Sequence, residues 1–212
     1  MSGERSGVRL ADGPAPVTTE DESVRPARPD AQTPAPRRVE GAWLDDRAAR
    51  QVIAALAAGG ARALFVGGCV RDALLGRPVG DIDMATDAEP QDVRRLLTEA
   101  GIRTVPTGIE HGTVTAVLAN RGYEITTFRH DVETDGRRAR VSFGADLAQD
   151  AARRDFTINA LYADAEGTVI DPLGTGLGDI ALRRVRFIGD AAARIREDYL
   201  RILRYFRFHA LY

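Results

Sequence analysis

The chain of 212 residues is 44% hydrophobic and 28% charged, which suffices for one domain with an apolar core and the beginning of a second. No stretch approaches about 18 consecutive apolar residues, and the N-terminus lacks the basic-then-apolar order of a signal peptide, so we expect no membrane span and no membrane partner. The single cysteine, Cys69, excludes internal disulfides and a cysteine-based zinc site and favours a cytoplasmic protein, whereas the net charge of −2 indicates no particular partner.

Residues 1–40 differ in composition from the rest of the chain. They hold six of the ten prolines and no aromatic residue, which cannot bury a core and predicts a disordered tail. Trp43, the only tryptophan, is interpreted as a packing anchor that opens the ordered part. Apolar residues then recur at helical spacing from Leu44, which predicts a helix that ends at Gly59-Gly60.

A short apolar strand over 64–66 leads into the turn Gly67-Gly68 and then into a helix predicted over 70–75, which carries Arg71. A glycine turn ahead of a helix lets backbone N–H groups approach a phosphate, helped by the positive end of the helix dipole. Taken alone, such a turn is most often only a turn.

Asp81 and Asp83 are predicted to open the next strand. Side chains alternate across a strand, so both carboxylates should point to one face, where they would repel each other unless a cation lies between them. Oxygen ligands of this kind suit Mg²⁺, which usually takes one or two carboxylates together with substrate phosphates. The alternative is a solvated strand edge.

A helix is predicted from Pro90 to the stop at Gly101, followed by a hairpin with strands over 112–118 and 123–128. We expect its turn at residues 120–122. Glu124, on the second strand, is open to two interpretations: an exposed glutamate on an edge strand, or a third carboxylate facing Asp81 and Asp83.

The polar segment 129–144 is long for a loop, and loops of this length are usually functional or disordered. Residues 150–164 predict a helix with charged residues at its start, Arg153, Arg154 and Asp155. Composition alone would make these solvated charges. The glycines of 171–179 lack the spacing of a dinucleotide-binding fingerprint and predict a turn.

A long helix is predicted over 190–211. Its apolar side would consist of Tyr199, Leu200, Leu203 and Phe206. A polar stripe recurs every three residues at Asp198, Arg201, Arg204 and Arg207. A surface ion pair would explain Asp198 with Arg201 but leaves the last two arginines without a carboxylate nearby in sequence. Between residues 183 and 207 eight arginines stand against three acidic residues, which predicts a basic face for an anionic partner.

These motifs together resemble the class II tRNA nucleotidyltransferase and bacterial poly(A) polymerase family, within the polymerase-β-like nucleotidyltransferases. The string GGCVRDALLG…DIDMAT is similar to motif A of that family, and YEITTF, RRDFTINAL and EDYLRILRYFRF are similar to later motifs in the same order. The resemblance runs from about Trp43 to the C-terminus. It implies an α+β fold: a head over 41–172 with a mixed or antiparallel sheet flanked by helices, then the first helices of an all-α neck over 173–212.

The resemblance also implies roles for individual residues. Asp81, Asp83 and Glu124 would be the catalytic carboxylates that hold two Mg²⁺ ions. The phosphates and sugar of the nucleotide would be bound by Gly67, Gly68, Arg71, Arg153, Arg154 and Asp155. Asp198 and Arg201 would read the base edge in place of a nucleic-acid template, with Arg204 and Arg207 in the same stripe. Segment 129–144 would be a flexible loop near the nucleotide.

The implied activity is the transfer of CMP and AMP from CTP and ATP to the 3′ end of tRNA. A poly(A) polymerase shares all these motifs, and an enzyme that adds only A also remains open, as does a non-catalytic nucleotide- or RNA-binding module of the same fold. Members of the family are usually longer, with helical body and tail domains, and the pattern stops in mid-helix, so we interpret the chain as a fragment. The sequence sets no oligomeric state.

Overall fold

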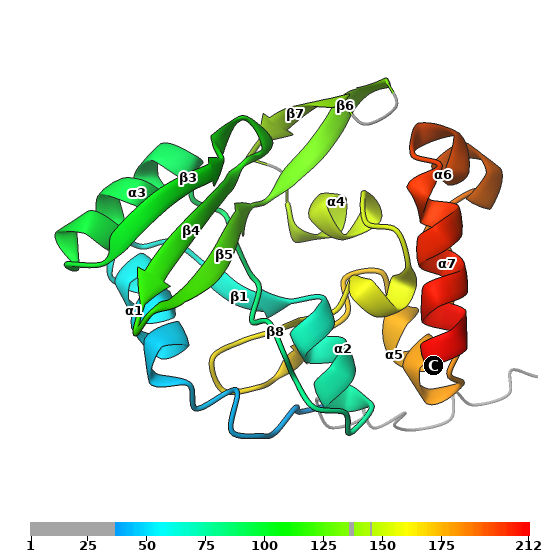
Figure 1. Ribbon diagram of the computed structural model, residues 1–212, viewed down its shortest axis with the longest axis horizontal. Coiled ribbons are helices and arrows are strands. Elements are labelled where there is room, and N and C mark those ends of the chain that lie inside the picture. The colour runs from blue at the N-terminus through cyan, green and yellow to red at the C-terminus, as the bar shows by residue number, and fades with distance from the viewer. Residues whose placement is uncertain (1–36, 136–137, 145) are drawn as a thin grey trace, which may run out of the picture. The chain divides into compact units, whose positions relative to one another are not determined.

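The computed structural model describes residues 37–135, 138–144 and 146–212, which fall in one compact unit from Pro36 to Tyr212 (Figure 1). Its main element is a seven-stranded mixed sheet. The strands lie in the order β3 (Arg103–Gly108), β4 (Thr113–Leu118), β5 (Arg121–Thr127), β2 (Met84–Thr86), β1 (Ala63–Val66), β8 (Tyr162–Ala163) and β9 (Val169–Ile170). Strand β2 pairs with β5 in parallel, and the other pairings of the sheet are antiparallel. The predicted α+β class with a mixed sheet is confirmed.

Two helices, α1 (Arg47–Ala58) and α3 (Pro90–Glu99), pack on one face of the sheet and lie on the same side of it in Figure 1. Helix α1 begins where Asp46 accepts hydrogen bonds from the backbone N–H groups of Ala48 and Ala49, at 3.0 and 2.9 Å. Its buried residues recur at helical spacing at Ala49, Val52, Ile53 and Leu56. Both helices agree with the sequence prediction, and Trp43 packs edge-on against Phe65 as an anchor.

The other helices are α2 (Gly68–Leu74), α4 (Leu147–Ala152), α5 (Gly176–Ala181), α6 (Ala191–Glu197) and α7 (Leu200–Leu211), with the 3₁₀ turns η1 (Ile109–His111) and η2 (Thr157–Asn159). Of these, α4 packs on the opposite face of the sheet. A smaller apolar cluster joins Ala85 of β2, Tyr162 of β8 and Ala151 of α4. No helix within the described ranges is both long and apolar enough to cross a membrane.

The predicted hairpin is confirmed as β4 and β5, with a tighter turn than expected. Ala119 and Asn120 both have positive φ, 47° and 59°, which is the twist of a two-residue hairpin turn. Strand β5 lies inside the sheet, between β4 and β2, so the interpretation of Glu124 as an edge-strand residue is wrong. The edge strand on this side of the sheet is β3, which the sequence analysis did not predict and which contains Pro106, a residue suited to an edge.

Three boundary predictions are wrong. Segment 129–144 is not a loop but contains the paired strands β6 (Arg129–Asp135) and β7 (Arg138–Phe143). Residues 150–164 are not one helix: α4 ends at Ala152, and η2 and β8 follow. Asp81 and Asp83 precede the strand, since β2 begins at Met84. For segment 129–144, strong local polarity concealed the pairing of β6 with β7, the next strand in sequence.

The predicted long helix over 190–211 is broken at Asp198, which has extended backbone angles of φ −153° and ψ 106°. Its carboxylate accepts from the N–H of Leu200 at 3.0 Å and so starts α7 as a cap. The predicted apolar side is exposed: Tyr199, Leu203 and Phe206 are 70%, 67% and 63% exposed. Helix α7 instead turns its arginine stripe and Phe208 toward the rest of the unit.

The predicted tail, residues 1–40, lies mostly outside the described residues. Its last residues are part of the structure, since Val39 is buried and its N–H donates to the carbonyl of Gly167 at 2.8 Å. The ordered part therefore begins before Trp43. The boundary near residue 172 between a head and a neck stays a prediction.

Candidate functional site

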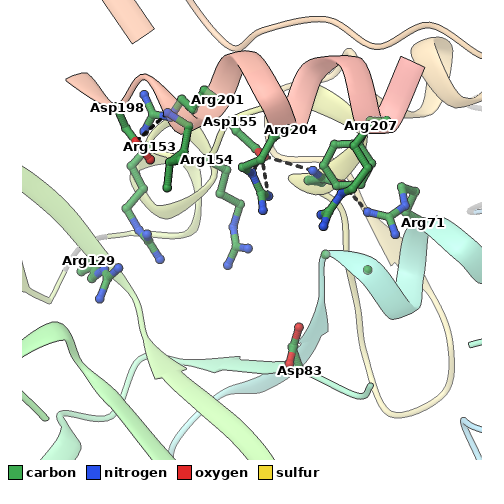
Figure 2. Close-up of a pocket in the computed structure, with 15 residues that line it drawn as sticks. Arg71, Asp83, Arg129, Arg153, Arg154, Asp155, Asp198, Arg201, Arg204 and Arg207 are labelled. Carbon is green, nitrogen blue, oxygen red and sulfur yellow. Dashed lines mark hydrogen bonds and ion pairs between the residues drawn. The ribbon is translucent and has the colours of Figure 1, made fainter. Parts of the chain in front are cut away.

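A cavity of about 710 Å³ opens between the Gly67-Gly68 turn, the start of β2, the segment after α4, and α7 (Figure 2). It is lined by Gly67, Gly68, Arg71, Asp83, Arg129, Arg153, Arg154, Asp155, Asn159, Asp198, Leu200, Arg201, Arg204, Arg207 and Phe208. Every predicted nucleotide-binding residue is in this set. Figure 2 shows Asp83 on one side of the space and the arginines of the other elements across it.

The glycine turn forms one wall of the cavity. Gly67 has φ 73° and ψ −117°, a backbone conformation that strongly favours glycine, and its N–H donates to the carbonyl of Leu161 at 3.0 Å. The guanidinium of Arg154 lies beside this turn, with Nη1 3.7 Å from the position that a Cβ at Gly67 would take. The missing side chain thus leaves the backbone open next to a cation.

Asp83 and Glu124 share one face of the sheet. Met84 pairs with Ile125 and Ala85 with Thr126, so the residues just before each, Asp83 and Glu124, are neighbours by register. Met84 and Ile125 belong to the α1–α3 core, which leaves the two carboxylates on the opposite face, that of the cavity.

Electrostatics place Asp81 in the same group. Burial raises the pKa of Asp83, and repulsion from Glu124 and then Asp81 raises it further, while Arg154 acts in the opposite direction. Asp81 and Glu124 are themselves exposed and do not line the cavity. Within the described ranges no three His, Cys, Asp or Glu side chains come together as a ready metal site. Asp83 is thus repelled by both of the other carboxylates, but the three side chains do not form a complete set of metal ligands.

The two arginines after α4 are held by a buried carboxylate. Asp150, whose side chain is 1% exposed, accepts from Nε of Arg153 at 2.8 Å and from Nη2 of Arg154 at 3.1 Å. Tyr162 donates its hydroxyl to the same carboxylate at 2.6 Å. Burial alone would raise the pKa of Asp150, but Arg154 and Arg153 outweigh it and lower that pKa. The guanidinium groups are therefore fixed in place at the cavity wall.

Asp155 connects this segment to α7. One of its oxygens accepts from the N–H of Phe156 at 2.8 Å and from Nδ2 of Asn159 at 3.0 Å, and the other pairs with Arg204 at 2.6 Å. Arg204 therefore does have a carboxylate partner, one that lies far away in sequence. This ion pair fixes the middle of the arginine stripe over the cavity.

Arg201 and Asp198 line the cavity but do not form the expected ion pair. The guanidinium of Arg201 pairs with Glu197 at 2.6 Å and donates to the carbonyl of Arg194 at 2.8 Å. The break between α6 and α7 points the side chains of Glu197 and Asp198 in different directions. Glu197 therefore pairs with Arg201, whereas Asp198 caps α7.

Arg71 makes more contacts within the protein than the sequence analysis predicted. Its Nε and Nη2 donate to Asp72 at 3.0 and 2.9 Å, and Nη1 donates to Asn159 at 2.5 Å. It also lies over the rings of Phe208 and Tyr212, about 5 Å from each centroid. Arg71 thus joins α2 to α7 and has little donor capacity left for a ligand.

Four lining residues were not predicted: Arg129, Asn159, Leu200 and Phe208. Asn159 lies within RRDFTINAL and Phe208 ends the arginine stripe, so the same motifs carried a signal for both. Arg129 is the first residue of β6, and the sequence had assigned it to a loop.

Cys69 is buried under the turn, and burial raises the pKa of its thiol to about 12, consistent with a small core residue.

Comparison with known proteins gives a consistent result. Residues 63–186, more than half of the chain, match the poly A polymerase head domain. A CCA-adding enzyme of Streptococcus sanguinis is 49% identical over 175 residues, which cover 82% of this chain and 43% of that protein. The crystal structure of the Bacillus stearothermophilus CCA-adding enzyme in complex with CTP superposes with a TM-score of 0.68 at 44% identity and covers 76% of this chain and 38% of that one.

A third relative is a tRNA nucleotidyltransferase whose crystal structure contains a primer tRNA and an incoming ATP analog. It superposes with a TM-score of 0.60 at 33% identity and covers 74% of this chain and 44% of that one. The chain thus spans less than half the length of each of these relatives. Both the family match and the mixed sheet with its arginine-lined cavity lead to one conclusion: the chain belongs to the poly A polymerase head domain family.

Proposed function

We propose that this chain is the nucleotide-binding and catalytic part of a Mg²⁺-dependent enzyme that transfers CMP and AMP, from CTP and ATP, to the 3′ end of tRNA without a template. The observation that carries this function is a single cavity in which Asp83 faces arginines from several elements. Similar proteins are named CCA-adding enzymes, and similar structures hold CTP in one case and a primer tRNA with an ATP analog in another. A cytoplasmic location fits the single cysteine.

The reaction requires a site that balances a triphosphate's charge. The 3′ oxygen of the primer attacks the α-phosphorus of the nucleotide, and pyrophosphate leaves. Arg153 and Arg154 can donate to phosphate oxygens with planar forks, and Asp150 holds both before a ligand arrives. Such preorganisation reduces the rearrangement needed during the reaction. Gly67 and Gly68 leave room for the phosphates beside Arg154.

Asp81, Asp83 and Glu124 would hold the Mg²⁺ ions. Carboxylate oxygens are the ligands that Mg²⁺ prefers, and the repulsion around Asp83 is what a divalent cation would relieve. When bound, the metal would neutralise phosphate charge and favour deprotonation of the attacking hydroxyl.

Asp198 and Arg201 would select the base. A carboxylate accepts from the exocyclic amine that C and A share, and a guanidinium donates to a ring nitrogen or carbonyl oxygen. U and G lack the amine at the matching position, so the pair would favour CTP and ATP. Glu197 and the carbonyl of Arg194 hold Arg201 at the cavity wall, while Arg204 and Arg207 extend the same stripe.

The decisive experiment incubates the chain with tRNA that lacks its 3′ CCA, with Mg²⁺ and with each labelled nucleotide in turn. We expect C and then A to be added, and no addition from UTP or GTP. Long tails from ATP alone would instead identify a poly(A) polymerase, and a single A added only to tRNA ending in CC would identify an A-adding enzyme. Nucleotide binding without any addition under all conditions would leave a non-catalytic binding module.

A further inference from the structure

A tyrosine that does not line the cavity controls the geometry of an arginine that does. Tyr162 of β8 is fully buried, and its hydroxyl makes two hydrogen bonds. It donates to Oδ2 of Asp150 at 2.6 Å and accepts from Nε of Arg154 at 3.1 Å. The guanidinium of Arg154 also lies over the Tyr162 ring, 5.3 Å from its centroid.

These contacts leave one nitrogen of Arg154 for a ligand. Its Nε is bound by Tyr162 and its Nη2 by Asp150, whereas Nη1 lies beside Gly67, 3.7 Å from where a Cβ there would be. A guanidinium held at two of its three nitrogens cannot rotate, so the direction of the third is fixed by the first two.

We propose that Tyr162 is a positioning residue, which aims Nη1 of Arg154 at a phosphate group of the nucleotide beside the Gly67 turn. Because the ligand group is a phosphate, this role rests on the proposed function. Tyr162 itself does not touch the nucleotide. Its hydroxyl acts through Arg154, and Asp150 completes the support from α4.

The molecule contains a matched control. Tyr123 of β5 is equally buried, and its hydroxyl donates to Asp46 at 2.9 Å. Asp46 pairs with Arg121 at 3.1 Å, and Arg121 lies over the Tyr123 ring at 5.6 Å. The same three residue types therefore form a related but more exposed cluster, and none of its members lines the cavity.

The test compares Tyr162→Phe with Tyr123→Phe in the whole chain. Each variant keeps its ring and loses one hydroxyl, so each should lower the melting temperature by about a few degrees, and Tyr162→Phe by more because its hydroxyl makes two hydrogen bonds. Calorimetric titration with inorganic triphosphate should show about tenfold weaker binding for Tyr162→Phe, the size of a lost hydrogen bond to a charged group. Tyr123→Phe should bind inorganic triphosphate as the unaltered chain does.

A double-mutant cycle shows whether the effect passes through Arg154. Lysine at position 154 keeps a charge but has no Nε–H for the Tyr162 hydroxyl, so Tyr162→Phe should add almost nothing in an Arg154→Lys chain. An equal loss in both backgrounds would overturn the role of Tyr162 as a positioning residue.

Three other results separate this role from the proposed function. Equal binding of triphosphate by both tyrosine variants, or none by the unaltered chain, would overturn the role of Tyr162. Weakened binding in Tyr162→Phe alone, in a chain that adds no nucleotide to tRNA, would support that role and overturn the proposed function.

Discussion

At the scale of single residues, Asp83 is placed at a cost to stability. It is partly buried, close to two like charges, and its pKa is raised by that burial and by Glu124 and Asp81. A side chain under repulsion contributes little to the fold, and strongly perturbed carboxylates in a cavity are typical of functional sites. A carboxylate at this position is therefore better explained by function than by structure.

Replacing Asp83 or Asp81 by asparagine should separate the effect of the carboxylate on activity from its effect on stability. Nucleotide addition should fall by about a hundredfold or more, because the proposed metal site would lose a ligand, while the melting temperature in EDTA should stay the same or rise. Single-turnover addition and thermal melts measure the two quantities. Asp92→Asn, at an exposed position on α3, serves as the control and should change neither. Undiminished addition by a chain with both aspartates changed to alanine would contradict the metal role of this pair.

At the scale of elements, the main contribution of α4 to the site is one carboxylate, that of Asp150. It begins with a capping box in which Asp146 and Gln149 exchange hydrogen bonds, and its fourth residue, Asp150, lies against Tyr162 of β8 and the two arginines after the helix. The buried cluster around Asp150 thus joins a helix, a strand and the cavity wall.

The stability that Asp150 provides should depend on pH. Its pKa in the folded chain is lowered from 3.8, so its contribution is present above that value and is lost as the pH falls through the lower, folded-state pKa. Asp150→Asn should destabilise the chain by about 3 kcal/mol near neutral pH, because it leaves buried arginines without their partner.

Urea unfolding of the unaltered chain and of Asp150→Asn, repeated from neutral to acidic pH, measures this difference. The gap between the two should shrink below the unfolded pKa of 3.8. A gap that stays constant across that range would show that Asp150 does not act through its charge.

At the scale of the whole molecule, the cavity has an excess of positive charge that the net charge of the chain does not indicate. The net charge of the chain is −2, yet within the described residues the cavity wall has seven arginines and three aspartates. The balance there favours a polyanion, although the molecule as a whole repels one weakly.

Binding of CTP should therefore weaken as salt rises. Partly exposed arginines lose much of their attraction when the screening length shortens, so the dissociation constant should rise several-fold between about 50 mM and about 500 mM NaCl. Arg207→Gln should weaken binding at low salt and flatten this dependence, whereas Arg95→Gln, on the exposed face of α3, should change neither. Affinity that does not respond to salt would argue against charge as the source of binding.

Much of the fold could be predicted from local pattern. Helices α1 and α3 have buried residues at helical spacing between clear start and stop signals, and the β4–β5 hairpin has β-branched strands around a tight turn. The errors occurred where a polar segment forms strands, as in β6 and β7, or where a side chain starts a new helix, as at Asp198.

The sequence by itself determined most of the charged residues that line the cavity, because the motifs of the family place charged groups at fixed positions along the chain. Only the tertiary structure decided how those groups pair. Arg204 with Asp155, Arg154 with Tyr162, and Asp83 beside Glu124 are separated by eight to 49 positions and meet only because strands and helices bring them together. Partner choice between charges depends on distances of a few ångströms, and those distances are a property of packing.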